Sequence, residues 1–126
     1  MANESVKTTV DVTAQLIDYR NRGITEPVVD NEGQPVRGED GQIQLKPVTL
    51  RDVATTALVN NLRGDDNMPP DRKKMSFSLA VRINSQDNPS FTAEELAFLD
   101  DRIGRAYAPG IVGPASMLLN PASVVS

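Results

Sequence analysis

The side chains that could carry out chemistry in this chain are mainly carboxylates, because the sequence contains neither histidine nor cysteine. Their absence excludes disulfides, thiolate metal sites and the Ser-His-Asp and Cys-His arrangements of nucleophilic catalysis. Among the adjacent acidic pairs, Glu94 with Glu95 and Asp100 with Asp101 lie in a predicted helix. Neighbouring residues on a helix point about 100° apart, so neither pair converges on one substrate atom. We therefore predict a protein that is not an enzyme and that binds no cofactor.

Two acidic stretches offer oxygen ligands to a hard cation. Asp30–Gly33 looks like the start of a calcium loop, but its sixth position is Pro35 instead of the required glycine. Asp65, Asp66 and Asn67 could hold a divalent cation weakly, and a solvated acidic loop is the favoured interpretation. The sequence therefore predicts a turn at the first place, a solvated loop at the second, and no metal site.

The charge of the chain argues against nucleic acid and anionic lipid as partners. Thirteen Lys and Arg stand against 17 Asp and Glu, which gives a net charge of −4. The basic run Arg72-Lys73-Lys74 has no aromatic residues interleaved for base stacking, so it is best explained as a solvated first helical turn. No segment resembles a secretory signal or is long and apolar enough to span a bilayer. We expect a soluble protein that is made in the cytoplasm.

The first part of the chain predicts a β arm. Apolar and polar residues alternate over residues 6–16, a pattern typical of a half-buried strand. The polar stretch 19–23 breaks this strand, and Pro27-Val28-Val29 fits a short edge strand or an extended segment. Turn signals at residues 30–33 and 39–41 then predict hairpin connections. We find no internal repeat.

Helical periodicity begins at Thr49, a predicted N-cap, and continues to a predicted stop at Gly64. Residues 71–84 alternate like a strand but also have a helical apolar face, and we favour helix. The clearest helix start is at Thr92 and Glu95, which form a capping box flanked by the hydrophobic staple of Phe91 and Leu96. This helix is expected to end before Pro109-Gly110, and a short last helix to begin at Pro114.

The sequence thus predicts an α+β fold, with an N-terminal β-hairpin arm over residues 1–48. A small bundle of three to four helices follows over residues 49–119, and residues 120–126 form a C-terminal tail. The expected core residues are Leu50, Val53, Leu58, Leu79, Ile83, Leu96, Leu99 and Ile103. The apolar segment 106–119, interrupted by proline and glycine, is either core or a docking surface. The candidate interaction residues are Val10, Val12, Tyr107, Ile111, Val112, Met117, Leu118 and Leu119.

The order of motifs resembles that of a group of small, largely uncharacterised proteins of tailed bacteriophages and prophages. The resemblance covers roughly residues 8–119. It is carried by Val10-Asp11-Val12-Thr13, Asp40-Gly41, Val48–Val53, Phe91–Leu96 and Ile103–Pro109. It implies a phage context and a helix at residues 71–84, and it transfers no catalytic residues.

In that context we expect non-enzymatic protein–protein contacts, as a virion structural or assembly component whose partners are other phage proteins or copies of itself. The alternative is a soluble binder of a host protein, acting in host takeover or against host defence, with an acidic surface that occupies a basic site. The expected location is accordingly the virion or the host cytoplasm. We also expect the N-terminal arm or the C-terminal tail to be ordered mainly through neighbouring subunits, because an open strand edge tends to recruit another chain.

Overall fold

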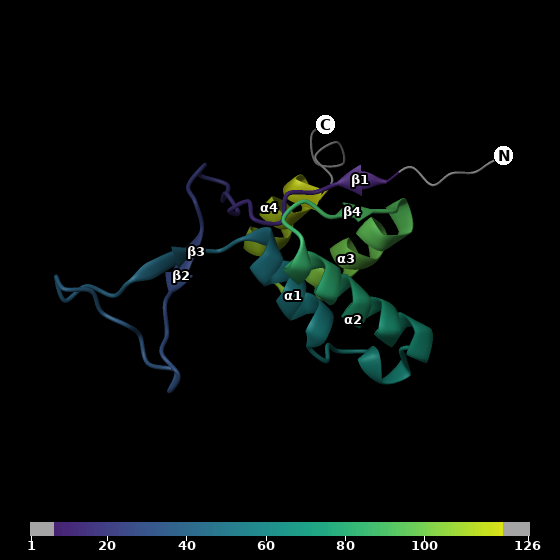
Figure 1. The fold of residues 1–126 in the computed structure, drawn as a ribbon, viewed down its shortest axis with the longest axis horizontal. Coiled ribbons are helices and arrows are strands. Elements are labelled where there is room, and N and C mark those ends of the chain that lie inside the picture. The colour runs from purple at the N-terminus through teal and green to yellow at the C-terminus, as the bar shows by residue number, and fades with distance from the viewer. Residues whose placement is uncertain (1–6, 120–126) are drawn as a thin grey trace.

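The computed structural model describes residues 7–119 of the 126-residue chain and confirms the α+β class. Within that range it contains four helices and two antiparallel two-stranded sheets (Figure 1). Strands β1 (Thr8–Thr9) and β4 (Ser90–Phe91) form one sheet, and β2 (Thr25–Pro27) and β3 (Leu45–Pro47) form the other. The helices are α1 (Leu50–Val59), α2 (Pro70–Ser85), α3 (Ala93–Ala106) and α4 (Pro109–Leu119). The tail predicted for residues 120–126 lies outside the described residues.

Helix α1 is the centre of the helical core, since it packs against α2, α3 and α4. Of the eight predicted core residues, seven are buried, and Leu96 is half-buried against the same cluster. The core also buries residues from the N-terminal segment and from α4, among them Val10, Val12, Leu16, Ala115 and Leu119. The core therefore depends on both ends of the described chain.

Helix α1 begins as predicted but ends earlier. The Thr49 side chain accepts a hydrogen bond from the Asp52 N–H, and the Asp52 carboxylate accepts one from the Thr49 N–H, which completes a capping box. The last helical residue is Val59 instead of Leu62, and Gly64, with φ of 91°, precedes a short 3₁₀ turn at Asp65–Asn67. Helix α1 does not continue past Val59 to Leu62, because the N–H of Leu62 donates to the Asp65 carboxylate at 2.7 Å instead of to a carbonyl of the helix.

Residues 70–85 form a single helix, which confirms the favoured interpretation of this ambiguous stretch. Leu79, Ala80 and Ile83 are buried, whereas Phe77 is 69% exposed and Val81 is 52% exposed. The apolar residues that alternate like those of a strand lie on two different faces of this helix. Only one of them packs on the core, so the apolar residues Phe77 and Val81 stay at the surface.

Helix α3 starts with the predicted capping box. The Thr92 side chain accepts from the Glu95 N–H at 3.2 Å, and Glu95 Oε1 accepts from the Thr92 N–H at 2.9 Å. Both Glu95 oxygens also accept from the Arg82 guanidinium, at 2.9 and 3.1 Å. Glu95 therefore joins the start of α3 to α2.

We expect Thr92→Ala to lower the free energy of unfolding by about 0.5–2 kcal/mol, because it leaves an amide at the helix start without its acceptor. The sequence alone predicts a smaller loss for Glu95→Ala. The ion pair with Arg82 reverses that order, and we expect Glu95→Ala to cost more than Thr92→Ala. Chemical denaturation measures both, with the exposed neighbour variant Glu94→Ala as control. Equal midpoints for all three variants would show that the capping box contributes nothing.

The strand predicted for residues 6–16 is shorter than expected. Only Thr8 and Thr9 pair with β4, after which the N–H groups of Val10 and Val12 donate to the carbonyls of Pro89 and Asp87. The Asp11 carboxylate accepts from the Thr13 N–H and hydroxyl and bends the chain away. Residues 8–16 are therefore ordered by contacts within the chain, so the expectation that the N-terminal arm is ordered mainly through neighbouring subunits is wrong for this segment.

Residues 16–48 form a branched arm of three β-hairpins, spanning residues 16–24, 28–36 and 36–44. Each tip has the same pair of backbone hydrogen bonds and one residue with positive φ, which is Asn21, Gly33 or Gly41. Asp18 and Asp30 each accept two backbone N–H bonds within their turns. The arm is thus a structural repeat, which corrects the conclusion that the chain has none.

Two rings of three backbone hydrogen bonds hold the branches together. In the inner ring Leu16 donates to Val48, Val48 to Ile24 and Ile24 to Leu16, at 2.8–2.9 Å. In the outer ring Val28 donates to Gln44, Gln44 to Val36 and Val36 to Val28, also at 2.8–2.9 Å. The sheet of β2 and β3 joins the two rings and carries the outer two hairpins away from the helices (Figure 1). We call residues 25–47 the outer arm.

Helix α4 is longer than predicted. It begins at Pro109, so Pro114 lies inside the helix and not at its start. Proline fixes φ near the helical value, which makes Pro109 a suitable first residue. Pro114 removes only the one N–H that would bond the Gly110 carbonyl.

Candidate interaction surfaces

The acidic loop 65–67 is not fully solvated as expected, because Asp65 is buried against α3. The side chains of Asp65 and Arg102 are 6% and 3% exposed, and Arg102 Nη1 donates to Asp65 Oδ1 at 2.6 Å. Arg102 also donates to the carbonyls of Ala57 and Asn60, so it fastens the end of α1 to α3. This hydrogen bond from Arg102 lowers the pKa of the Asp65 carboxyl despite its burial, which by itself raises the pKa.

The other residues considered for chemistry lie apart from one another. Asp100 accepts from the Ser116 hydroxyl, Asp101 pairs with Arg105 at 3.2 Å, and Glu94 is exposed. The basic run 72–74 lies exposed in the first turn of α2, as predicted. Within residues 7–119, no group of three or more acidic side chains is placed to hold a metal ion.

We expect calorimetric titration with Ca²⁺, Mg²⁺ and Zn²⁺ to give no stoichiometric site with submicromolar affinity. The physical reason is that the Asp65 carboxylate already has a cationic partner and its acidic neighbour in the loop, Asp66, is exposed. One tight site for any of the three ions would contradict this prediction.

We expect the stability of the fold to decrease in acid. Hydrogen bonds from Arg102 and Arg82 lower the pKa values of Asp65 and Glu95 from their ordinary values of 3.8 and 4.5. The unfolded chain therefore binds protons more readily than the folded one, and stability present above about pH 4.5 is lost as the pH falls below it. Urea denaturation across this range measures the effect, and Glu95→Gln is expected to flatten it. An unfolding midpoint that does not change with pH would contradict the prediction.

The arm has no hydrophobic core of its own. No side chain of residues 17–47 is buried, and the arm exposes five large apolar residues, which are Ile17, Tyr19, Val29, Ile43 and Leu45. A two-stranded ribbon is marginally stable by itself and presents unpaired backbone groups at its edges. Such a ribbon can accept a further strand or apolar side chains from another chain.

An apolar groove of about 490 Å³ lies between the first hairpin and α4. Ile17 and Tyr19 form one wall, and the other is formed by Pro109, Gly110, Gly113, Pro114 and Met117. Met117, which is 48% exposed, is the one predicted interaction residue that lines this groove.

The remaining predicted interaction residues lie in or against the core. Val10, Val12 and Leu119 are buried, and Tyr107, Ile111, Val112 and Leu118 are half-buried against the same cluster. Most of segment 106–119 therefore packs in or against the core, as the first of the two alternatives predicts, whereas Met117 lines a surface groove. The sequence gives no sign that Ile17 and Tyr19 line a groove, because the polar residues around Tyr19 predict a break in the strand.

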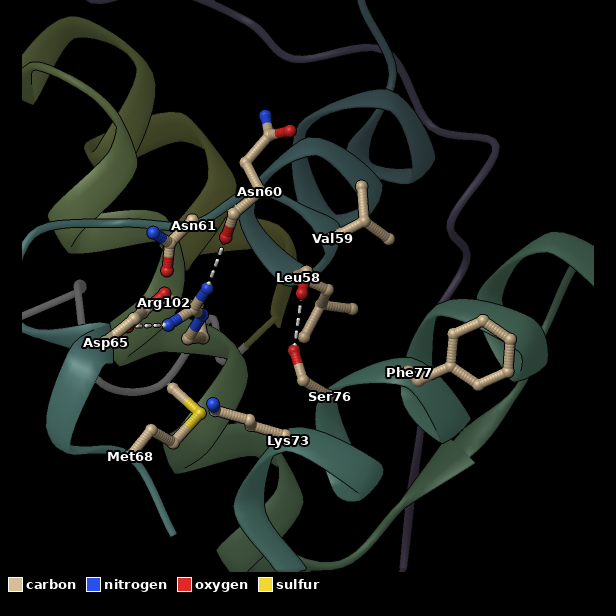
Figure 2. A pocket seen from close by; sticks show the side chains of 10 residues that line it. All are labelled: Leu58, Val59, Asn60, Asn61, Asp65, Met68, Lys73, Ser76, Phe77 and Arg102. Atoms are coloured by element: carbon tan, nitrogen blue, oxygen red, sulfur yellow. Dashed lines mark hydrogen bonds and ion pairs between the residues drawn. The ribbon is translucent and has the colours of Figure 1, made fainter. Parts of the chain in front are cut away.

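A second groove, of about 330 Å³, lies where the end of α1 meets α2, and we call it the α1–α2 groove (Figure 2). Val59, Met68 and Phe77 give it apolar lining, and Lys73 brings a positive charge. The buried Arg102 and Asp65 lie at its inner side and bond to each other. The groove therefore combines exposed apolar residues with a cation that has no ion-pair partner within the described part of the chain.

Comparison of the chain with models of known protein families, with curated proteins and with solved structures found no significant match. In the described residues, no helix has the length and apolar character needed to cross a membrane.

Proposed function

We propose that this protein is a non-enzymatic structural or assembly component of a tailed-phage virion, acting through protein–protein contacts. The observation that carries the proposal is the outer arm, which has no buried residue and projects away from the helices (Figure 1). The resemblance of residues 8–119 to small tailed-phage proteins supplies the phage context. The partners are other phage proteins or copies of this chain.

Unpaired strand edges and exposed apolar side chains explain why an arm is the element that makes contacts. Branching at the two hydrogen-bonded rings sets the direction of each hairpin through the backbone, without a core. An arm built in this way is preorganised, so less conformational entropy is lost when it binds.

The test is mass spectrometry of purified particles from a strain that makes either the full chain or a chain that lacks most of the outer arm. Glu26 and Lys46 are paired across β2 and β3, so an Asn-Gly turn can replace residues 27–45. We expect the full chain to be abundant in particles and the shortened chain to fold but to be lost from them. Glu94→Ala, a substitution at an exposed position of α3, is the control, and this variant should behave as the full chain does.

Absence of the full chain from particles, together with its production early in infection, would overturn the virion role. That result would favour the alternative, a binder of a host protein. For such a binder the acidic tips of the outer arm would be the part that occupies a basic site.

A further inference from the structure

The tips of the outer arm form an acidic surface with exposed apolar residues. Residues 28–44 contain four carboxylates, of Asp30, Glu32, Glu39 and Asp40, against the single cation of Arg37. Val29 and Ile43 lie exposed next to these turns. The side-chain carboxylates of Glu32 and Glu39 make no hydrogen bond or ion pair with other described residues, so their charges are available to a partner.

The α1–α2 groove has the complementary character. Lys73 lines it, and Arg63 and Lys74 are exposed in the same stretch of chain, residues 61–74, whereas Arg72 lies over the Phe98 ring beside a different groove. The exposed acids of this stretch are Asp66 and Asp71, since Asp65 is buried and paired with Arg102. Phe77 and Val59 expose apolar side chains at the groove (Figure 2). Val81 is also exposed and lies one turn after Phe77 on α2.

We propose that an acidic tip of the outer arm of one copy docks into the α1–α2 groove of a second copy. The inference rests on the proposed function, which it deepens by naming the partner and both contact surfaces. Opposite charges orient the tip, and burial of Val29 or Ile43 against Phe77 supplies apolar contact.

The two surfaces cannot meet within one molecule as the structure has it. Figure 1 shows the outer arm extending to one side of the bundle, away from the connection between α1 and α2. Each copy therefore offers one tip surface and one groove, and the contact is heterologous. Contacts of this kind build closed rings or open filaments, according to the rotation between neighbours.

The test uses two variants of the full chain with reversed charges. The tip variant is Glu32→Lys with Glu39→Lys, and the groove variant is Lys73→Glu with Lys74→Glu. None of these four side chains makes a hydrogen bond or ion pair with another described residue, so each variant should fold with an unchanged circular dichroism spectrum. Sedimentation velocity over a range of protein and salt concentrations measures association.

We expect the unchanged chain to associate and to do so less at high salt. Each variant alone places like charges at the contact, which should raise the dissociation constant at least about tenfold. An equal mixture of the two should associate as the unchanged chain does, because each tip then meets a groove of opposite charge. Phe77→Ser should weaken association of the unchanged chain without altering the fold.

Three results would overturn the inference. They are a chain that stays monomeric at every concentration, variants that associate alone as strongly as the unchanged chain, and a mixture that associates no better than its components. Each of them leaves the virion role standing if the chain is found in particles. Association through the mapped surfaces by a chain that is absent from particles would instead remove the proposed function and keep the contact.

Discussion

Arg102→Ala is expected to lower the free energy of unfolding by about 3–5 kcal/mol, because it removes one partner of a buried ion pair. The Asp65 carboxylate would remain buried without its cation, and the carbonyls of Ala57 and Asn60 would lose a donor. The C-terminal end of α1 and the loop to α2 are both held by this one guanidinium. Urea denaturation at neutral pH measures the loss.

Arg105→Ala is the matched control for Arg102→Ala. Arg105 is on the same helix and lies 3.9 Å from Asp65, but its side chain is 45% exposed. Exposed ion pairs contribute about 0–1 kcal/mol, so this variant should be nearly as stable as the unchanged chain. The double variant Asp65→Ala with Arg102→Ala should recover part of the loss, since it leaves no charge unpaired. Equal and small effects of the two arginine variants would contradict the role given to Arg102.

Phe91→Ala is expected to cost about 3–5 kcal/mol, the usual range when a buried phenylalanine is truncated and leaves a cavity. Phe91 is fully buried, and it pairs with Thr8 across the β1 and β4 sheet. The Arg82 guanidinium lies over its ring, 5.5 Å from the ring centre. The ring thus joins the N-terminal segment, α2 and the start of α3, and its loss should loosen all three.

Phe77→Ala provides the comparison with Phe91→Ala, because it removes the same side chain from an exposed position on α2. In a dilute solution of monomers its effect on stability should stay within about 0.5 kcal/mol. Amide hydrogen exchange adds a local measurement, in which Phe91→Ala should increase exchange at Val10 and Val12, whose N–H groups bond beside β4. Similar losses in the two phenylalanine variants would contradict this account of the core.

The sequence predicts those parts of the fold that depend on residues close together in the chain. The N-cap at Thr49, the capping box at Thr92 and the apolar face of α3 are local signals, and the structure confirms them. The pair of Asp65 and Arg102 is not local, because 37 residues separate its members. The sequence does not predict the first hairpin, because the residue with positive φ in its turn is Asn21 and not a glycine.

The interaction surfaces were harder to predict than the fold for a related reason. Alternation in residues 71–84 places Phe77 and Leu79 on one face of a strand, whereas the helix separates them. An apolar residue in a sequence carries no sign of whether the core reaches it. Only the packing of α2 on α1 shows that Phe77 and Val81 stay exposed.

Because the two rings of hydrogen bonds fix the base of every hairpin in the arm, the length of each hairpin can change independently of the others. Every hairpin begins and ends at the same ring. Residues inserted at a tip, for example next to Glu32 or Glu39, would therefore lengthen one branch and leave the positions of the others unchanged. The rings are made by main-chain groups of Leu16, Ile24 and Val48 and of Val28, Val36 and Gln44, which side-chain substitutions do not remove. The arm can therefore diverge in reach and in surface chemistry while the helical bundle that carries it stays the same.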